Sequence, residues 1–164
     1  MLMAPPTVPL QRVARTVDEV VHALHTSQRV TMGGPSGSLT LLEHSLQCAD
    51  MLALAYPEDI DLQIAGLVHD LGRVIAPDDI VDHALHSAHF VGVVLGGRVA
   101  SLVRQHHNTD TPTRLGVGTV AYGAELRDVL ALRRADERAR SHGVSTDSVT
   151  TWERIMRRSI LRAS

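Results

Sequence analysis

A short apolar stretch that ends in a histidine beside an aspartate constrains this chain more than any other feature. Residues 64–72 read IAGLVHDLG, so His69 and Asp70 follow a run of aliphatic and small side chains. Such a run is typical of a buried helix, which has no packing need for an imidazole and a carboxylate at its end. Both groups are ligands for iron, zinc and manganese. The pair therefore predicts a metal site at the end of a buried helix.

Helix start and stop signals account for the rest of the chain. Capping boxes begin at Thr16 and Thr40, each with Glu three residues later. Asp59 or Asp61 is expected to cap a third helix, with Gly72 as the residue just past its end. We expect helices over residues 16–27, 40–56, 59–71, 83–95, 98–107, 119–141 and 147–162. Because no stretch alternates polar and apolar residues for long enough to form a sheet, the predicted fold is all-α.

Length and composition fit one globular domain. We expect residues 16–164 to form it and residues 1–15, with three of the seven prolines, to be an N-terminal arm. A formal charge of −2 argues against a nucleic-acid partner. No apolar run has the ~18 residues of a membrane span, the start does not read as a signal peptide, and Cys48 is the single cysteine. These features predict a cytoplasmic protein without a membrane partner; they leave the oligomeric state open.

The histidines and acids around the His-Asp pair suggest the remaining ligands. His44 lies one turn inside the helix that begins at Thr40. The third ligand is one of His83, His86 and His89, which share a helical face and are not separated by spacing alone.

Two later residues complete the candidate set. His106 is preferred over its neighbour His107, because it falls on the same helical face as Leu102 and Val103. Asp136 is the last candidate, although a charged run such as RRADER is more often a solvated helix face with ion pairs. The candidate metal ligands are thus His44, His69, Asp70, one of His83, His86 and His89, then His106 and Asp136, with His69 and Asp70 also the expected catalytic residues.

The order of these residues resembles the two-metal form of the HD-domain superfamily. Four segments are most similar to the oxygenases of that superfamily that cleave phosphonates: LEHSLQCA at 42–49, AGLVHDLG at 65–72, residues 83–106, and LRRAD at 132–136. The similarity runs over about residues 38–140. It implies a helical HD domain with a dinuclear site, and its spacing favours His83 as the third ligand.

The resemblance also implies a cofactor and a reaction. Asp70 would bridge two iron ions, with His44, His69 and Asp136 on one and His83 and His106 on the other. Such enzymes, similar in mechanism to myo-inositol oxygenase, use a mixed-valent Fe(II)/Fe(III) pair and dioxygen to oxidise and cleave a small hydroxylated substrate.

Three positions depart from the phosphonate-cleaving pattern. Gly34 and Gly37 stand where those oxygenases carry Tyr and Glu, and Asp110 stands where they carry a phosphonate-binding Lys. The anion-binding stretch that follows is here Leu115–Thr119, with few hydroxyl groups. We therefore expect a substrate other than a standard phosphonate.

Two other functions remain open from the sequence. One is hydrolysis of a phosphate ester or nucleotide with Mn, Zn or Mg in place of iron, because a metal ion lowers the pKa of a bound water. Every basic residue is Arg, and Arg73, Arg98 and Arg104 are candidate phosphate ligands, with Arg73 and Arg104 the chosen substrate-binding residues. The other is a degenerate HD module that binds without catalysis. Oxidation is preferred because the segments match the oxygenases best.

Overall fold

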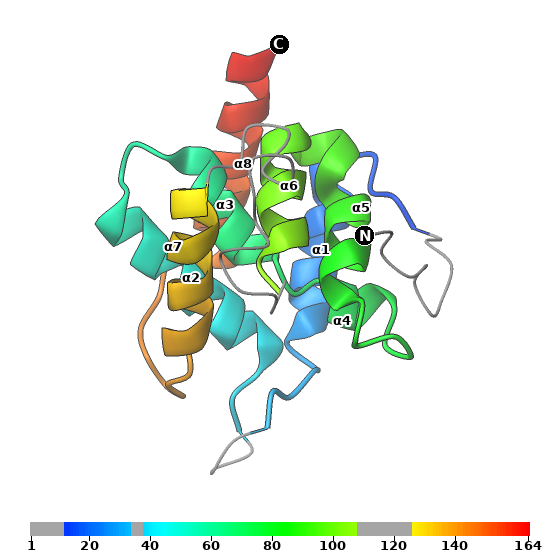
Figure 1. The fold of residues 1–164 in the computed structure, drawn as a ribbon, viewed down its shortest axis with the longest axis vertical. Helices are drawn as coiled ribbons and strands as arrows, with labels where there is room; N and C mark the ends of the chain where they lie inside the picture. The colour runs from blue at the N-terminus through cyan, green and yellow to red at the C-terminus, as the bar shows by residue number, and fades with distance from the viewer. Residues whose placement is uncertain (1–11, 34–37, 108–125) are drawn as a thin grey trace.

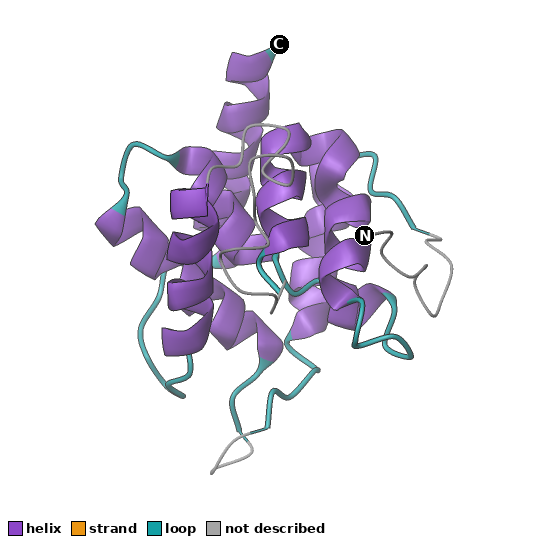
Figure 2. Ribbon diagram, viewed as in Figure 1, coloured by secondary structure: helices purple, strands orange, loops and turns teal. Residues whose placement is uncertain are grey.

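The computed structural model describes residues 12–33, 38–107 and 126–164, and this part of the chain is helical (Figures 1 and 2). Within it no β-strand occurs; Thr31 and Thr40 form one isolated antiparallel bridge. The predicted all-α fold is confirmed. The helices are α1 (Val17–Ser27), α2 (Leu41–Ala55), α3 (Ile60–Val68), α4 (Gly72–Ile75), α5 (His83–Leu95), α6 (Gly97–Gln105), α7 (Leu126–Arg138) and α8 (Val149–Ala163).

The predicted capping residues begin their helices. The Thr16 and Thr40 side chains accept from the N–H of Glu19 and Glu43, and both glutamates reach back to the cap N–H, so both capping boxes form. Asp59, rather than Asp61, caps α3 by accepting from the Leu62 N–H. Each cap satisfies N–H groups that have no partner inside the helix.

Several predicted boundaries differ from the structure; the helix predicted over 98–107, for example, ends at Gln105. The helix expected to reach Leu71 ends at Val68, and Gly72 begins α4 instead of terminating the earlier helix. A Cβ at Gly72 would lie 2.0 Å from the His83 carbonyl oxygen, so glycine is required there by close packing rather than by a helix end. The helix predicted over 119–141 ends at Arg138, and its first expected residues lie outside the described part of the chain.

Helix α3 lies inside the domain and carries its His-Asp pair into the interior. All residues from Leu62 to Gly72 are buried, and α2, α6 and α7 pack against this helix. α5 and α6 lie side by side (Figure 1), joined at Gly96, whose φ of +93° suits glycine. α8 packs against α1, α3 and α5, and its Trp152 and Met156 are buried. The catalytic candidates are therefore at the centre of the fold.

The N-terminal arm predicted over residues 1–15 falls largely outside the described residues, which begin at residue 12. Ala14 is buried, and its N–H donates to the Phe90 carbonyl at 2.8 Å. Residues just before α1 therefore pack on α5. Among the described helices, none combines the length and the apolar character that a membrane crossing needs.

Candidate metal centre

Five separate segments bring the six predicted ligands together. His44 comes from α2, His69 and Asp70 follow α3, His83 begins α5, His106 follows α6, and Asp136 lies on α7. The four histidines and Asp70 are at most 2% exposed, and the Asp136 side chain is partly buried. Figure 1 shows α3 and α6 running between α7 on one side and α5 on the other. The fold thus collects imidazole and carboxylate groups in a place where water is scarce.

Asp70 presents each of its two oxygens to a different group of histidines. Its Oδ2 lies 3.6 Å from His44 Nε2 and 3.5 Å from His69 Nε2. Its Oδ1 lies 3.0 Å from His83 Nε2 and 3.6 Å from His106 Nε2. A carboxylate placed in this way has the geometry of a bridge between two cations.

Asp136 completes the first group. Its Oδ1 is 3.0 Å from His44 Nε2 and 3.4 Å from His69 Nε2. The ligand atoms of His44, His69, Asp70 and Asp136 all lie within 4.8 Å of one another. Two imidazoles and two carboxylates in that space are a suitable donor set for one divalent ion.

The second group contains His107, which is not among the predicted ligands. The ligand nitrogens of His83, His106 and His107 lie within 4.8 Å of one another, and the His83 and His107 ring centroids are 4.5 Å apart. His107 was judged from a helical projection, but α6 ends at Gln105 and both histidines follow it. The helical projection therefore does not apply to His107. Its position directly after His106 is the one signal that could have indicated it.

The structure separates the three histidines of α5. His83 contacts Asp70, whereas His86 Nε2 lies 2.9 Å from Asp79 Oδ2 in a buried pair. His89 lines a surface groove between α5 and α6. The histidine that the resemblance favoured is thus the one beside the bridging candidate.

Backbone carbonyls fix the tautomer of all four central imidazoles. The Nδ1 atoms of these rings lie 2.5–2.7 Å from main-chain oxygens: His44 from Ala139, His69 from Gly66, His83 from Ile80 and His106 from Val103. A carbonyl can only accept, so each Nδ1 must carry the proton and donate it. In the neutral ring, each Nε2 then has a lone pair directed at the centre, the arrangement that metal-binding histidines usually have.

These lone pairs need a cation. His44 Nε2 and His69 Nε2 are 3.2 Å apart, and while both rings are neutral, with their protons on Nδ1, neither nitrogen can donate to the other. His106 Nε2 is buried and has no hydrogen-bond partner among the described residues, since Asp70 Oδ1 at 3.6 Å is too far. Two carboxylates face the same space. The donor set is compatible with a divalent-metal site.

The charges of the protein groups agree with this fit. Burial raises the pKa of Asp70 and of Asp136, but the facing imidazoles outweigh burial and hold both pKa values below the ordinary range, so both groups are carboxylates. Burial lowers the pKa of His69, yet the charge of Asp70 and the contact with Asp136 raise it to about 9. From protein groups alone, the site takes up a proton. A metal ion would displace that proton and supply the positive charge.

The chain's local structure explains how adjacent residues reach one site. Helical neighbours point ~100° apart, but here the backbone tightens after Val68. The Leu71 N–H donates to the Val68 carbonyl and the Arg73 N–H to the Asp70 carbonyl, both three-residue hydrogen bonds. This tight turn directs His69 and Asp70 towards the same space.

The two arginines chosen from the sequence lie in different places. Arg73 Nε is buried, 3.4 Å from Asp70 Oδ2, on the first group's side of the bridge. Arg104 lines the groove between α5 and α6, with a volume of about 320 Å³, together with His89 and Ser101. The positions of Gly34, Gly37, Asp110 and Leu115–Thr119 lie outside the described residues.

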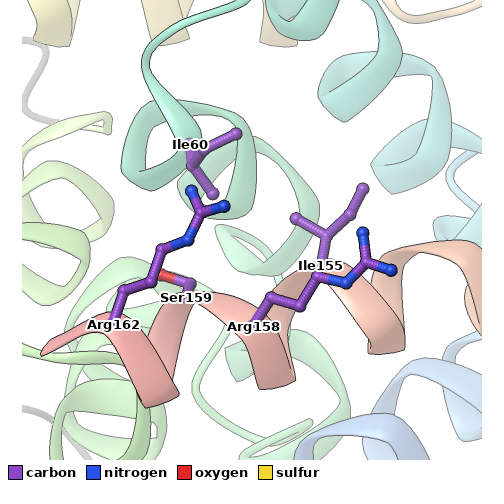
Figure 3. Close-up of a pocket in the computed structure, with 5 residues that line it drawn as sticks. All are labelled: Ile60, Ile155, Arg158, Ser159 and Arg162. Carbon is purple, nitrogen blue, oxygen red and sulfur yellow. The ribbon is translucent and has the colours of Figure 1, made fainter. Parts of the chain in front are cut away.

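A separate cavity lies between α3 and α8. Its volume is about 230 Å³, and Figure 3 shows Ile60 of α3 facing Arg158, Ser159 and Arg162 of α8. None of the six clustered residues lines it. Arg98, the third arginine considered from the sequence, binds Asp59 and Asp128. Both features are therefore distinct from the centre.

Comparison with known families agrees with the fold and the cluster. The HD domain family matches residues 41–142, more than half of the chain, and the protein belongs to this family. None of the curated proteins compared with the chain matches it. HD domains are commonly metal-dependent enzymes, and the buried histidine and aspartate cluster is compatible with a divalent-metal site.

Proposed function

We propose that the chain is a dinuclear metalloenzyme in which Asp70 bridges two ions. His44, His69 and Asp136 would hold the first ion, and His83 and His106 the second. The observation that carries this proposal is the division of the Asp70 contacts, with Oδ2 facing one pair of histidines and Oδ1 the other. The fixed tautomers support it, because they leave four imidazole lone pairs ready to bind.

We propose iron as the metal. Four imidazoles and two carboxylates make a donor set that suits iron and zinc better than magnesium, which prefers oxygen ligands and water. The segment resemblance to oxygenases favours iron over zinc and manganese. A mixed-valent Fe(II)/Fe(III) pair is the proposed working state.

The proposed reaction is oxidative cleavage of a small hydroxylated molecule by dioxygen. When bound, two redox-active ions would supply oxygen activation, and two divalent ions of any kind would supply a water of lowered pKa. The protein's part is to hold the ligands rigidly through their carbonyl partners and to exclude water by burial. Among the described residues, Asp70 is the carboxylate that faces the second group, whose other members are His83, His106 and the exposed His107.

Hydrolysis of a phosphate ester is the second candidate, and Arg73 favours it. Its buried Nε, 3.4 Å from Asp70, puts a permanent cation beside the centre, where it could pair with an anionic substrate. HD-family membership is also consistent with metal-dependent phosphohydrolysis. Substrate binding by Arg104 is less well supported, because that side chain lines an outer groove.

One experiment separates the candidates. The protein is loaded with iron in air, its metal content is measured, and its EPR spectrum is recorded after mild reduction. About two irons per chain with a coupled mixed-valent signal, and oxygen uptake with hydroxylated substrates, are expected. Rapid phosphate release from nucleotides or sugar phosphates, without oxygen uptake, would instead establish the hydrolase. A chain that binds no metal would be a non-catalytic HD module.

A further inference from the structure

Gln47 holds a main-chain segment that is remote in sequence but adjacent to the proposed centre. This side chain on α2 is only 3% exposed. Its Nε2 donates to the Ser141 carbonyl at 2.5 Å, and its Oε1 accepts from the Ser141 N–H at 3.2 Å. Both main-chain groups of one residue are thus bound by one amide.

The segment held by Gln47 supplies two contacts to His44. Asp136, in the last turn of α7, faces His44 Nε2 at 3.0 Å. Ala139, just past the end of that helix, accepts from His44 Nδ1 at 2.6 Å. Both nitrogens of the His44 ring therefore contact this segment, through two residues that are three positions apart.

Helix α7 alone does not fix this segment. The helix ends at Arg138, and the Ala139 N–H still bonds the Ala135 carbonyl at 2.9 Å, whereas the Ser141 N–H bonds Gln47 instead of its own helix. Glu43 also reaches the segment, through His142 at 3.0 Å, but that pair is solvent-exposed and so contributes little. Helix α7 thus holds the segment as far as Ala139, and the buried Gln47 amide holds it at Ser141.

We propose that Gln47 is a positioning residue for the first ion of the centre. Through Ser141, Gln47 fixes the position of the Ala139 carbonyl, and that carbonyl fixes the tautomer and the direction of His44. Through the same residue it holds the end of α7, the helix that carries Asp136. The inference rests on the proposed dinuclear function.

The test measures metal binding rather than turnover. Gln47→Met keeps the length of the side chain and removes both hydrogen bonds. Gln63→Met is the matched control, because Gln63 is also buried and its Nε2 bonds the Tyr56 and Pro57 carbonyls at 2.8 and 3.1 Å, away from the ligands. Wild type and both variants are titrated with Zn²⁺ against a competing chelator and with Co²⁺, whose visible spectrum reports the coordination geometry. Urea unfolding of the metal-free proteins gives their stabilities.

Loss of one outer partner of a ligand typically lowers metal affinity about 10–100-fold. We expect Gln47→Met to weaken one of the two binding events by that factor, to alter the Co²⁺ spectrum, and to leave the other event unchanged. Gln63→Met is expected to lose similar stability and to keep both affinities. Gln47→Asn, which keeps an amide that is too short to reach Ser141, is expected to weaken the same event and serves if the Met variant does not fold.

Unchanged affinities in a folded Gln47 variant, or equal weakening in Gln63→Met, would overturn the positioning role alone. A wild-type protein that binds neither Zn²⁺ nor Co²⁺ would overturn the proposed centre and this inference with it. The two failures are therefore distinguishable.

Discussion

Gly72 lies against the main chain of His83 so closely that no side chain fits between them. A Cβ at Gly72 would be 2.0 Å from the His83 carbonyl oxygen and 2.9 Å from its Cα. The Gly72 N–H donates to Ser87 Oγ at 2.6 Å, and that hydroxyl donates to the same His83 carbonyl at 2.8 Å. This contact sets the start of α5 beside Asp70, and it therefore sets the distance between the bridging candidate and one ligand of the second ion.

Gly72→Ala should separate α4 from α5. Because the clash is with backbone, it cannot be relieved by a rotamer change, and we expect a loss of about 2–3 kcal/mol of stability in urea unfolding. Zn²⁺ binding by the second group, which contains His83, should weaken as well. Gly97→Ala is the control, since a Cβ there meets nothing within 4 Å. Equal stability of the two variants would contradict the close contact.

Asp70→Asn should abolish the binding of both ions, whereas Asp136→Asn should abolish the binding of one. An amide cannot offer two anionic oxygens, so the proposed bridge is lost, while Asp136 faces only His44 and His69. We expect the metal content of the purified proteins to fall from about two ions per chain to none in Asp70→Asn and to about one in Asp136→Asn. Asp78→Asn, on an exposed side chain, should keep both ions. If Asp70→Asn retained two ions, the bridging assignment would be wrong.

Removal of metal should destabilise the protein. Ligand binding to the folded state adds about 2.7 kcal/mol at a free-metal concentration a hundred times the dissociation constant. For a chain of this size that corresponds to a fall in Tm of roughly 5–10 °C on chelation. Calorimetry with and without a chelator checks this, and restoration by added metal is the control. An unchanged Tm would count against a metal-loaded folded state.

The pair Arg98 and Asp59 should make stability depend on pH. Burial raises the pKa of Asp59, but two hydrogen bonds from the Arg98 guanidinium, at 2.6 and 2.8 Å, lower it below its ordinary value. A carboxyl group whose folded pKa is depressed contributes stability above its unfolded pKa and loses it as the pH falls through the folded value.

Asp59→Asn isolates that contribution, because asparagine also caps a helix well. In urea unfolding, the free energy of unfolding of this variant should fall below that of wild type by the largest amount at pH 7. This difference should shrink as the pH falls below the unfolded pKa of about 4. A deficit that is independent of pH would show that the ion pair contributes nothing.

Local signals were sufficient for the helices and insufficient for the centre's details. Thr16 and Thr40 begin helices because each capping box is completed within four residues. The end of α3 was placed too late, since the reason for glycine at position 72 is a contact with His83 that no local pattern contains. The same limit applies to His107, whose relation to His83 depends on how α5 and α6 pack.

From the sequence alone one could predict that this protein is helical, that it carries the ordered histidines and aspartates of an HD domain, and that arginine is its only permanently charged basic side chain. Packing of the helices was needed to show that His83 rather than His86 faces Asp70, that the two Asp70 oxygens contact different histidines, and that Ala139 orients His44. Helix starts depend on hydrogen bonds within one turn, whereas the centre depends on contacts between residues as many as 95 positions apart in the chain.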